Sequence, residues 1–170
     1  MTRRFADVEE DERGERRGLR TRRVLMGLLT LVPLIALTGL LGQRATTTTA
    51  AGPQAAIDVR APKTVRGGLF FQSRVTIRVS GRIQHPRLVL EPGWLEGMQV
   101  NSIEPQAQDE SSRGGRLVLA YSTLKPGDHV ELWLQFQVNP SNVGHRSYAL
   151  ELDDDTQRIA RVERTITVLP

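Results

Sequence analysis

The sequence predicts an all-β fold, an antiparallel sandwich of two sheets with seven to eight strands, preceded by one transmembrane α-helix and a disordered tail. Three observations predict it. Apolar and polar residues alternate with a period of two in several segments beyond residue 56, as in strands with one buried face. Turn-forming residues separate these segments, and none has a convincing helical pattern. A run of uncharged residues, Val24–Gly42, precedes them all.

The apolar run Val24–Gly42 predicts a helix that spans a membrane. Its 19 residues would form a helix of about 28 Å, close to the ~30 Å hydrocarbon core of a bilayer. Residues 1–23 hold eight Arg and six acidic residues, so we expect a disordered cytoplasmic tail. Because Lys and Arg near a membrane end stay inside, the protein is expected in the cell membrane with its C-terminal domain outside.

A cleaved signal is the alternative to this anchor. Secretory signals have apolar cores of about 7–15 residues, shorter than this run, and the nearest cleavage candidates, Ala50 and Ala51, lie well beyond Arg44. Thr21–Leu25 (TRRVL) is similar to a twin-arginine export signal. The length of the run favours an uncleaved anchor, and a cleaved signal of either type stays open.

The distribution of charge argues against a nucleic-acid partner. The chain has 23 Lys and Arg, but residues 52–170 hold 14 basic and 13 acidic residues. A nucleic-acid-binding domain concentrates positive charge on its folded part. Here the excess lies beside the apolar run, where it would meet anionic lipid headgroups. We therefore expect a lipid bilayer, and no nucleic acid, among the partners.

Residues 43–56 are rich in Thr and Ala and are expected to form a flexible linker. The extracytoplasmic domain is expected over residues 57–170, enough for one core. In the last expected strand, Arg164 interrupts the apolar side. The clearest strands are Val75–Val79, Val130–Val138, Tyr148–Leu152 and Val162–Val168, and shorter apolar segments are Ile57–Val59, Leu88–Leu90, Met98–Ile103 and Leu117–Tyr121.

Four motifs stand in order along the C-terminal part: Leu124-Lys125-Pro126-Gly127-Asp128, Val138-Asn139-Pro140, Leu152-Asp153-Asp154 and Thr165-Ile166-Thr167-Val168. This stretch, roughly residues 124–168, resembles immunoglobulin-like domains of bacterial membrane-anchored surface proteins. The resemblance implies a β-sandwich used for adhesion, spacing, or contact with proteins or glycans, and it assigns no functional residue. The segment Gly93–Pro105 has no place in that pattern, so a role specific to this protein would be expected there.

No pattern in the sequence predicts a catalytic residue, a cofactor or a metal ion. The chain has no Cys, which excludes thiol nucleophiles and thiolate metal sites. His85, His129 and His145 fall at separate loops or strand edges, whereas a zinc site needs at least two His at ligand spacing.

The acidic residues are interpreted in the same way. Asp153-Asp154-Asp155 lacks the Gly and the several oxygen positions of a calcium loop, so it is read as a polar turn. Glu104, Asp109 and Glu110 are expected in or beside an exposed loop. The alternative function, an envelope enzyme or metal-dependent binding protein, would need these loop carboxylates and histidines to converge in one cleft.

Trp133 has the same parity as Glu131, Gln135 and Gln137, so its ring should face away from the core. Exposed aromatic residues are favoured as binding anchors. We therefore take Trp133, Gln135 and Gln137 as candidate partner contacts; the alternative is that Trp133 packs under a neighbouring element. Trp94 is expected to fill the end of the core.

The sequence therefore predicts a single-pass membrane protein that is not an enzyme. Its outer β-sandwich would act as an interaction, accessory or structural module, and its partner would be another membrane or envelope protein. No cofactor is expected.

Overall fold

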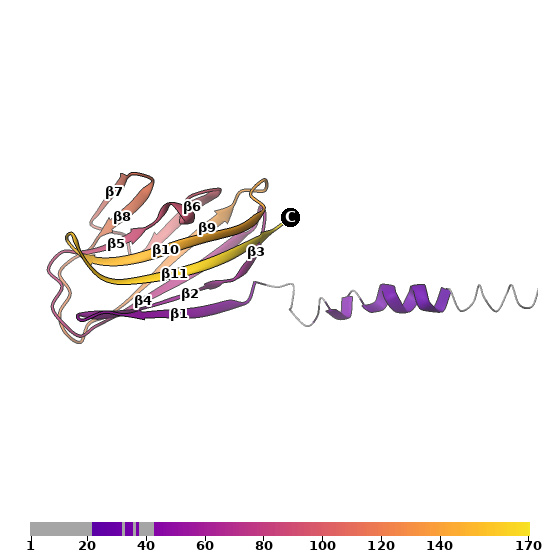
Figure 1. Cartoon of the computed structure of the whole chain (residues 1–170), viewed down its shortest axis with the longest axis horizontal. Helices are drawn as coiled ribbons and strands as arrows, with labels where there is room; N and C mark the ends of the chain where they lie inside the picture. The colour runs from indigo at the N-terminus through magenta and orange to yellow at the C-terminus, as the bar shows by residue number, and fades with distance from the viewer. Residues whose placement is uncertain (1–21, 32, 36, 38–42) are drawn as a thin grey trace, which may run out of the picture. The chain divides into compact units, whose positions relative to one another are not determined.

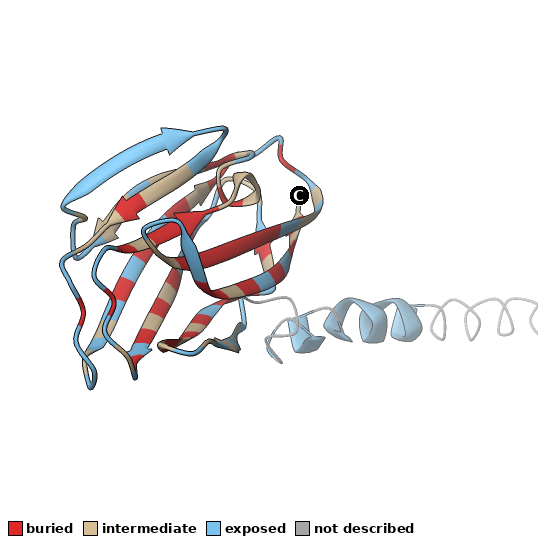
Figure 2. Cartoon of the chain, turned by 60° about the vertical axis from the view of Figure 1, so that its left-hand side comes forward, coloured by how far each residue is buried: buried red, intermediate tan, exposed pale blue. Residues whose placement is uncertain are grey.

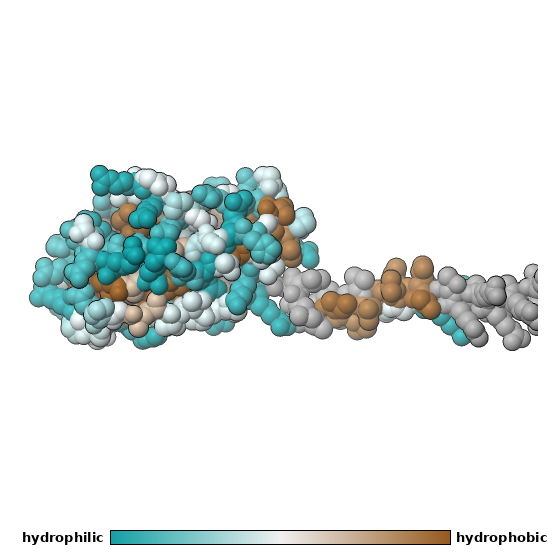
Figure 3. Space-filling view, viewed as in Figure 1, coloured by the Kyte–Doolittle hydropathy of each residue, from teal (hydrophilic) through white to brown (hydrophobic). Residues whose placement is uncertain are grey.

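The computed structural model describes residues 22–31, 33–35, 37 and 43–170, and the chain divides into two units, Met1–Gly42 and Gln43–Pro170. The described residues of the first unit are helical, and their apolar side chains, such as Leu28 and Leu37, are exposed (Figure 3). Within the described part of the chain, no helix combines the length and hydropathy that crossing a bilayer requires. Residues 1–21 of the expected tail, and 32, 36 and 38–42 of the expected span, lie outside the described residues.

Two β-sheets make up the second unit (Figure 1), so the predicted all-β, two-sheet class is confirmed. The described residues form eleven strands rather than the seven to eight expected. The five-stranded sheet has the order β1 (Ala45–Ala51), β2 (Ala55–Pro62), β4 (Phe70–Val79), β9 (His129–Val138) and β6 (Met98–Glu104). The six-stranded sheet has the order β3 (Thr64–Arg66), β11 (Gln157–Leu169), β10 (Gly144–Asp154), β5 (Pro86–Leu90), β8 (Arg116–Ala120) and β7 (Asp109–Arg113).

Neighbouring strands are antiparallel, as predicted, with one exception. The short strand β3 runs parallel to β11, with Thr64 opposite Thr167. This pairing places β3 at the edge of the six-stranded sheet, directly after β2 of the other sheet in the chain. The connection from Pro62 to Thr64 therefore passes from one sheet to the other.

The core lies between the sheets, where most strands turn alternate side chains inward. Buried and exposed residues alternate along several strands in Figure 2. Val75 and Ile77 on β4 follow this alternation, as the sequence predicts. Leu150 and Leu152 on β10 do so from the other sheet. The largest fully buried side chains are Trp94, Phe136, Ile57, Ile83, Leu88, Leu90, Leu119, Leu132, Leu134, Leu150, Leu152 and Ile166.

The expectation of a flexible linker over residues 43–56 is wrong. Strand β1 occupies Ala45–Ala51 and pairs with β2 along its whole length, with Ala45 opposite Pro62. The compact unit therefore begins at Gln43 instead of residue 57. Thr and Ala produce no apolar periodicity, but Thr is β-branched and an edge strand needs little apolar burial, so pairing with β2 is enough.

The expectation that Asp109 and Glu110 lie in or beside an exposed loop is also wrong in part. Asp109–Arg113 form strand β7, whose side chains are all exposed, and Gly114-Gly115 turn the chain into β8. Both glycines have positive φ, 59° and 75°, as the two-residue turns of tight hairpins require. The two glycines make the turn predictable. The strand before it is not, because five polar residues show no hydrophobic alternation.

Candidate partner-binding face

The outer face is the surface of the five-stranded sheet formed by side chains of β4, β9 and β6 that point away from the core. Register places these side chains in three rows across the strands. Along each strand, successive outward side chains are about 6.8 Å apart, and neighbouring strands are about 4.8 Å apart. The rows are Arg74, Trp133 and Glu104; Gln72, Gln135 and Ser102; and Phe70, Gln137 and Gln99.

A bulge in β6 completes these rows. The pairing register between β6 and β9 shifts between Val100 and Ser102. Because a shift of one residue exchanges the two faces of a strand, Ser102 and Glu104 join Gln99 on the outer face. Without the shift, Ile103 would point outward in their place.

Trp133 lies on the central strand of this face, β9, in one of its end rows, with 37% of its surface exposed. The guanidinium carbon of Arg74 lies 4.8 Å from the centroid of the indole ring, a cation–π contact. Arg74 also approaches Glu131, at 3.9 Å between the nearest nitrogen and oxygen. The ring therefore has the outward direction that the alternation predicts; its contact with a partner stays a prediction.

Gln135 and Gln137 lie beside Trp133 on β9. Gln135 is exposed, and its Oε1 accepts a long hydrogen bond of 3.4 Å from Ser102 Oγ. Gln137 is half-buried and also lines a hollow of about 410 Å³ at the end of the outer face. That hollow is lined by Gly97, Met98, Gln99, Gln137, Val138, Asn139 and Pro140.

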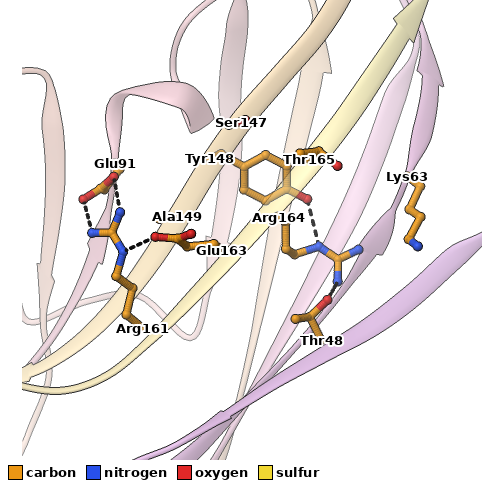
Figure 4. A pocket seen from close by; sticks show the side chains of 10 residues that line it. All are labelled: Thr48, Lys63, Glu91, Ser147, Tyr148, Ala149, Arg161, Glu163, Arg164 and Thr165. Carbon is orange, nitrogen blue, oxygen red and sulfur yellow. Dashed lines mark hydrogen bonds and ion pairs between the residues drawn. The ribbon is translucent and has the colours of Figure 1, made fainter.

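A second hollow, of about 470 Å³, is shown in Figure 4. Arg161 fills one side of it with ion pairs to Glu91, Glu151 and Glu163. The pair with Glu91 is bidentate, at 2.7 and 3.2 Å, so Arg161 is already engaged by carboxylates within the domain. The residues that line the hollow are Thr48, Lys63, Glu91, Ser147, Tyr148, Ala149, Arg161, Glu163, Arg164 and Thr165.

Arg164 lines the other side of that hollow and is itself buried. All five of its N–H donors are used within the domain, two of them on the backbone carbonyls of Val59 and Ala61. A guanidinium with no free donor ties the two sheets together and has none left for a ligand. In the sequence, Arg164 is recognisable only as a residue that interrupts the apolar side of the last expected strand.

The residues considered for catalysis do not converge on either hollow. Glu104 and His129 belong to the five-stranded sheet, whereas Glu110 and Asp153 belong to the six-stranded sheet. None of the four lines the hollows described above. In the part of the chain that the structure describes, no group of three or more His, Asp or Glu side chains has an arrangement suited to a metal ion.

The aspartates of Asp153-Asp154-Asp155 have separate contacts. The carboxylate of Asp154 accepts hydrogen bonds from the backbone N–H of Gln84 at 3.2 Å and of His85 at 2.7 Å. Asp155 forms an ion pair with Arg87 at 2.9 Å. Asp153 and Asp154 are the last residues of β10, and Asp155 lies in the turn that follows, so the polar turn read from the sequence is confirmed for Asp155 alone.

The segment Gly93–Pro105 serves both the core and the outer face. Trp94, at the end of the 3₁₀ helix η1 (Pro92–Trp94), is buried, and its Nε1–H donates to the carbonyl of Ala149 at 3.0 Å. Its ring contacts Phe136 and Tyr148, with centroid distances of 5.0 and 4.2 Å. The expectation that Trp94 fills the end of the core is confirmed, and β6 then supplies one side of the outer face.

Comparison with known proteins shows the fold. The N-terminal domain of the Streptococcus gordonii adhesin Sgo0707 is similar over 69% of this chain and 33% of that chain, with a TM-score of 0.51 and 8% sequence identity. CaCohA2 from Clostridium acetobutylicum matches 72% of this chain and 92% of its own, at a TM-score of 0.44 and 17% identity. AvmM, which catalyses macrocyclization in alchivemycin A biosynthesis, matches 76% of this chain and 90% of its own, at a TM-score of 0.44 and 8% identity. No family model and no curated protein matches the sequence.

At 8% identity, the adhesin domain establishes a shared β-sandwich and nothing more. The sandwich that the immunoglobulin-like resemblance implied is confirmed. Membership of the bacterial membrane-anchored surface proteins stays a prediction.

Proposed function

We propose that this protein is a single-pass membrane protein whose β-sandwich lies outside the cell and acts as a non-catalytic interaction module. The proposed contact surface is the outer face, with Trp133, Gln135 and Gln137 along its central strand, β9. The main support for the proposal is that Trp133 is 37% exposed and is not among the buried residues of the core.

The exposure of Trp133 needs a reason because the other positions along its side of β9 are polar. His129, Glu131, Gln135 and Gln137 share its parity, and a polar residue at 133 would continue their pattern. A large ring held on a rigid strand provides contact area at a low cost in conformational entropy. Such rings are frequent hot spots of binding interfaces, which supports a recognition role for Trp133.

The sequence supports the membrane anchor. Val24–Gly42 is long enough to span a bilayer, and the Arg residues before it favour a cytoplasmic N-terminus. The exposed apolar side chains among the described helical residues agree with a lipid environment. The predicted span ends at Gly42 and β1 begins at Ala45, so the sandwich would follow the span almost immediately in the sequence.

Photocrosslinking in intact cells tests the contact surface. A photoreactive amino acid placed at position 135 should form covalent adducts, whereas the same amino acid at Gln157, exposed at the start of β11, should form none. In the position-135 protein, Trp133→Ala should abolish the adducts. Absence of adducts at 135, or equal adducts at both positions, would contradict the proposed surface.

Protease treatment tests the location. A protease applied to whole cells should cleave the C-terminal domain of the full chain. A domain that is cut only after the cells are lysed would place it inside and refute the proposed orientation.

A further inference from the structure

Side-chain amides fill the middle of the outer face. Gln72 lies opposite Gln135, and Gln137 lies between Phe70 and Gln99. Three antiparallel strands hold these amides on a regular grid of about 4.8 by 6.8 Å. Because the strands are paired on both sides of β9, the grid is rigid before any ligand arrives, which lowers the entropy cost of binding.

The amides suit a ligand that carries many hydroxyl groups. Each Gln amide has two donor hydrogens and an acceptor oxygen, and each hydroxyl also donates and accepts. An amide can therefore bond a hydroxyl in either direction. Ser102 adds a hydroxyl of its own to the grid.

The charges on this sheet surface favour an uncharged ligand. Arg60, Arg74 and Arg78 are balanced by Asp58, Glu104 and Glu131 on the same surface. Arg78 forms an ion pair with Asp58, and Arg74 lies near Glu131. A charged polymer would gain nothing from this balanced surface, because attraction by one sign is offset by repulsion from the other.

Two exposed rings lie on either side of the amides. Phe70, 53% exposed, is in the row of Gln137, and Trp133 is two rows away, which corresponds to roughly 14 Å along the sheet. The negative face of an aromatic ring attracts the polarised C–H groups of a sugar ring and excludes water from them. A protein partner is favoured by a continuous apolar centre with a polar rim, whereas here polar amides separate the rings.

The hollow of about 410 Å³ extends the grid at the row of Gln137 and Gln99. Its volume falls within the range of pockets that hold small ligands, about 300–1,000 Å³. A side branch or the end of a sugar chain would have room there.

We propose that the outer face binds an uncharged, extended polysaccharide of the cell envelope. Trp133 and Phe70 stack on sugar rings, and the amides of Gln72, Gln99, Gln135 and Gln137 bond to hydroxyls. The proposal rests on the function proposed above, because it names the class of partner for the same surface.

A sedimentation assay tests the partner class. The full chain in detergent is mixed with delipidated, insoluble envelope from the cells that make the protein. One portion of the envelope is untreated, one is digested with proteinase, and one is oxidised with periodate, which cleaves the vicinal diols of sugars. Binding should survive the proteinase and 0.5 M salt, and it should weaken at least about tenfold after periodate.

The outcomes separate the two proposals. Binding that survives periodate but is lost after proteinase would mean a protein partner, overturning the polysaccharide and leaving the interaction module in place. Binding that 0.5 M salt abolishes would overturn an uncharged ligand. Failure of the untreated envelope to sediment the chain would overturn the polysaccharide, and the adducts at position 135 would then decide whether the interaction module stands.

Variants assign the binding to the outer face. Gln135→Ala, at an exposed position, and Trp133→Ala should each weaken sedimentation about tenfold, the effect of about 1.4 kcal/mol. Gln157→Ala, also exposed but on the other sheet, is the matched control and should change it less than about twofold. Equal binding by Gln135→Ala and Gln157→Ala, both with an unchanged circular dichroism spectrum, would overturn the amide site.

Discussion

Arg164 Nε donates a hydrogen bond of 3.0 Å to the phenol oxygen of Tyr148 inside the sandwich. The two residues lie opposite each other on β11 and β10 of the six-stranded sheet. The remaining donors of Arg164 reach the five-stranded sheet, so one guanidinium joins both sheets at their edge. These acceptors are Thr48 Oγ1 at 2.7 Å, Ala61 O at 2.8 Å, Val59 O at 2.9 Å and Thr46 Oγ1 at 3.0 Å.

Replacement of Arg164 should therefore destabilise the domain strongly. Arg164→Met removes five donors and leaves buried acceptors without partners, which should lower the free energy of unfolding by about 3 kcal/mol. The free energy of unfolding of Arg164→Lys, which keeps three donors, should lie between those of Arg164→Met and the unchanged chain. Urea denaturation of the full chain in detergent measures this, with Arg113→Met, on the exposed strand β7, as control. A loss as small as that of the control would mean that Arg164 is not required to join the sheets.

Alkaline pH should destabilise the domain through its tyrosines. Burial, with a smaller contribution from Glu110, raises the pKa of Tyr121 to about 12 from its ordinary 10.0. Burial also raises the pKa of Tyr148, which Arg164 opposes. Between pH 10 and 12 the unfolded chain loses phenol protons that the folded chain retains, so the free energy of unfolding falls as pH rises.

Tyr121→Phe should make this fall less steep. Urea midpoints measured at pH 9 to 12 provide the comparison. The chain has two Tyr, so absorbance at 295 nm in this variant reports Tyr148 alone. If the variant and the unchanged chain lose stability in parallel, Tyr121 does not contribute.

Asp153→Asn should stabilise the domain slightly at neutral pH. Burial, and then repulsion from Glu151, raises the pKa of Asp153, and its Oδ1 is buried without a hydrogen-bond partner among the described residues. A raised carboxyl pKa contributes stability in acid that is lost as pH rises, so the ionised Asp153 is unfavourable at pH 7. Nearby Arg residues, first Arg158, oppose this, so we expect a gain of about 0.5 kcal/mol.

The pH dependence of that gain identifies its cause. Below about pH 3, where Asp153 is mostly protonated in both the folded and the unfolded chain, Asp153→Asn and the unchanged chain should have nearly equal stability. Asp109→Asn, on the exposed strand β7, is the control. A gain that persists in acid would point to packing rather than charge.

Replacement of the two tryptophans should lower the stability of the domain by very different amounts. Trp94→Ala removes a buried ring and should cost about 3–5 kcal/mol, whereas Trp133→Ala should cost less than about 1 kcal/mol because its ring is on the surface. Since the chain has two Trp, fluorescence distinguishes them. Iodide should quench Trp133 in the Trp94→Phe variant and leave Trp94 shielded in the Trp133→Phe variant. A shielded Trp133 would mean that another part of the protein covers the outer face.

Strand β9 shows how much of the fold was predictable. Leu132 and Phe136 point inward and Trp133 points outward, as the alternation of the sequence indicates. One strand is enough for this inference, because the two faces of a strand are set by local backbone geometry. The candidate contacts Trp133, Gln135 and Gln137 could be grouped on one face for the same reason.

By itself the sequence determined which segments have one buried face, and therefore an all-β sandwich with Trp133 turned outward. The tertiary structure alone decided that β1 is a strand, because its support comes from β2 and from Arg164, which is 118 positions from Thr46. It also decided that Gln72, Gln99 and Ser102 lie beside Gln135 and Gln137. The physical reason is register: pairing between distant strands, and the shift within β6, set which side chains become neighbours.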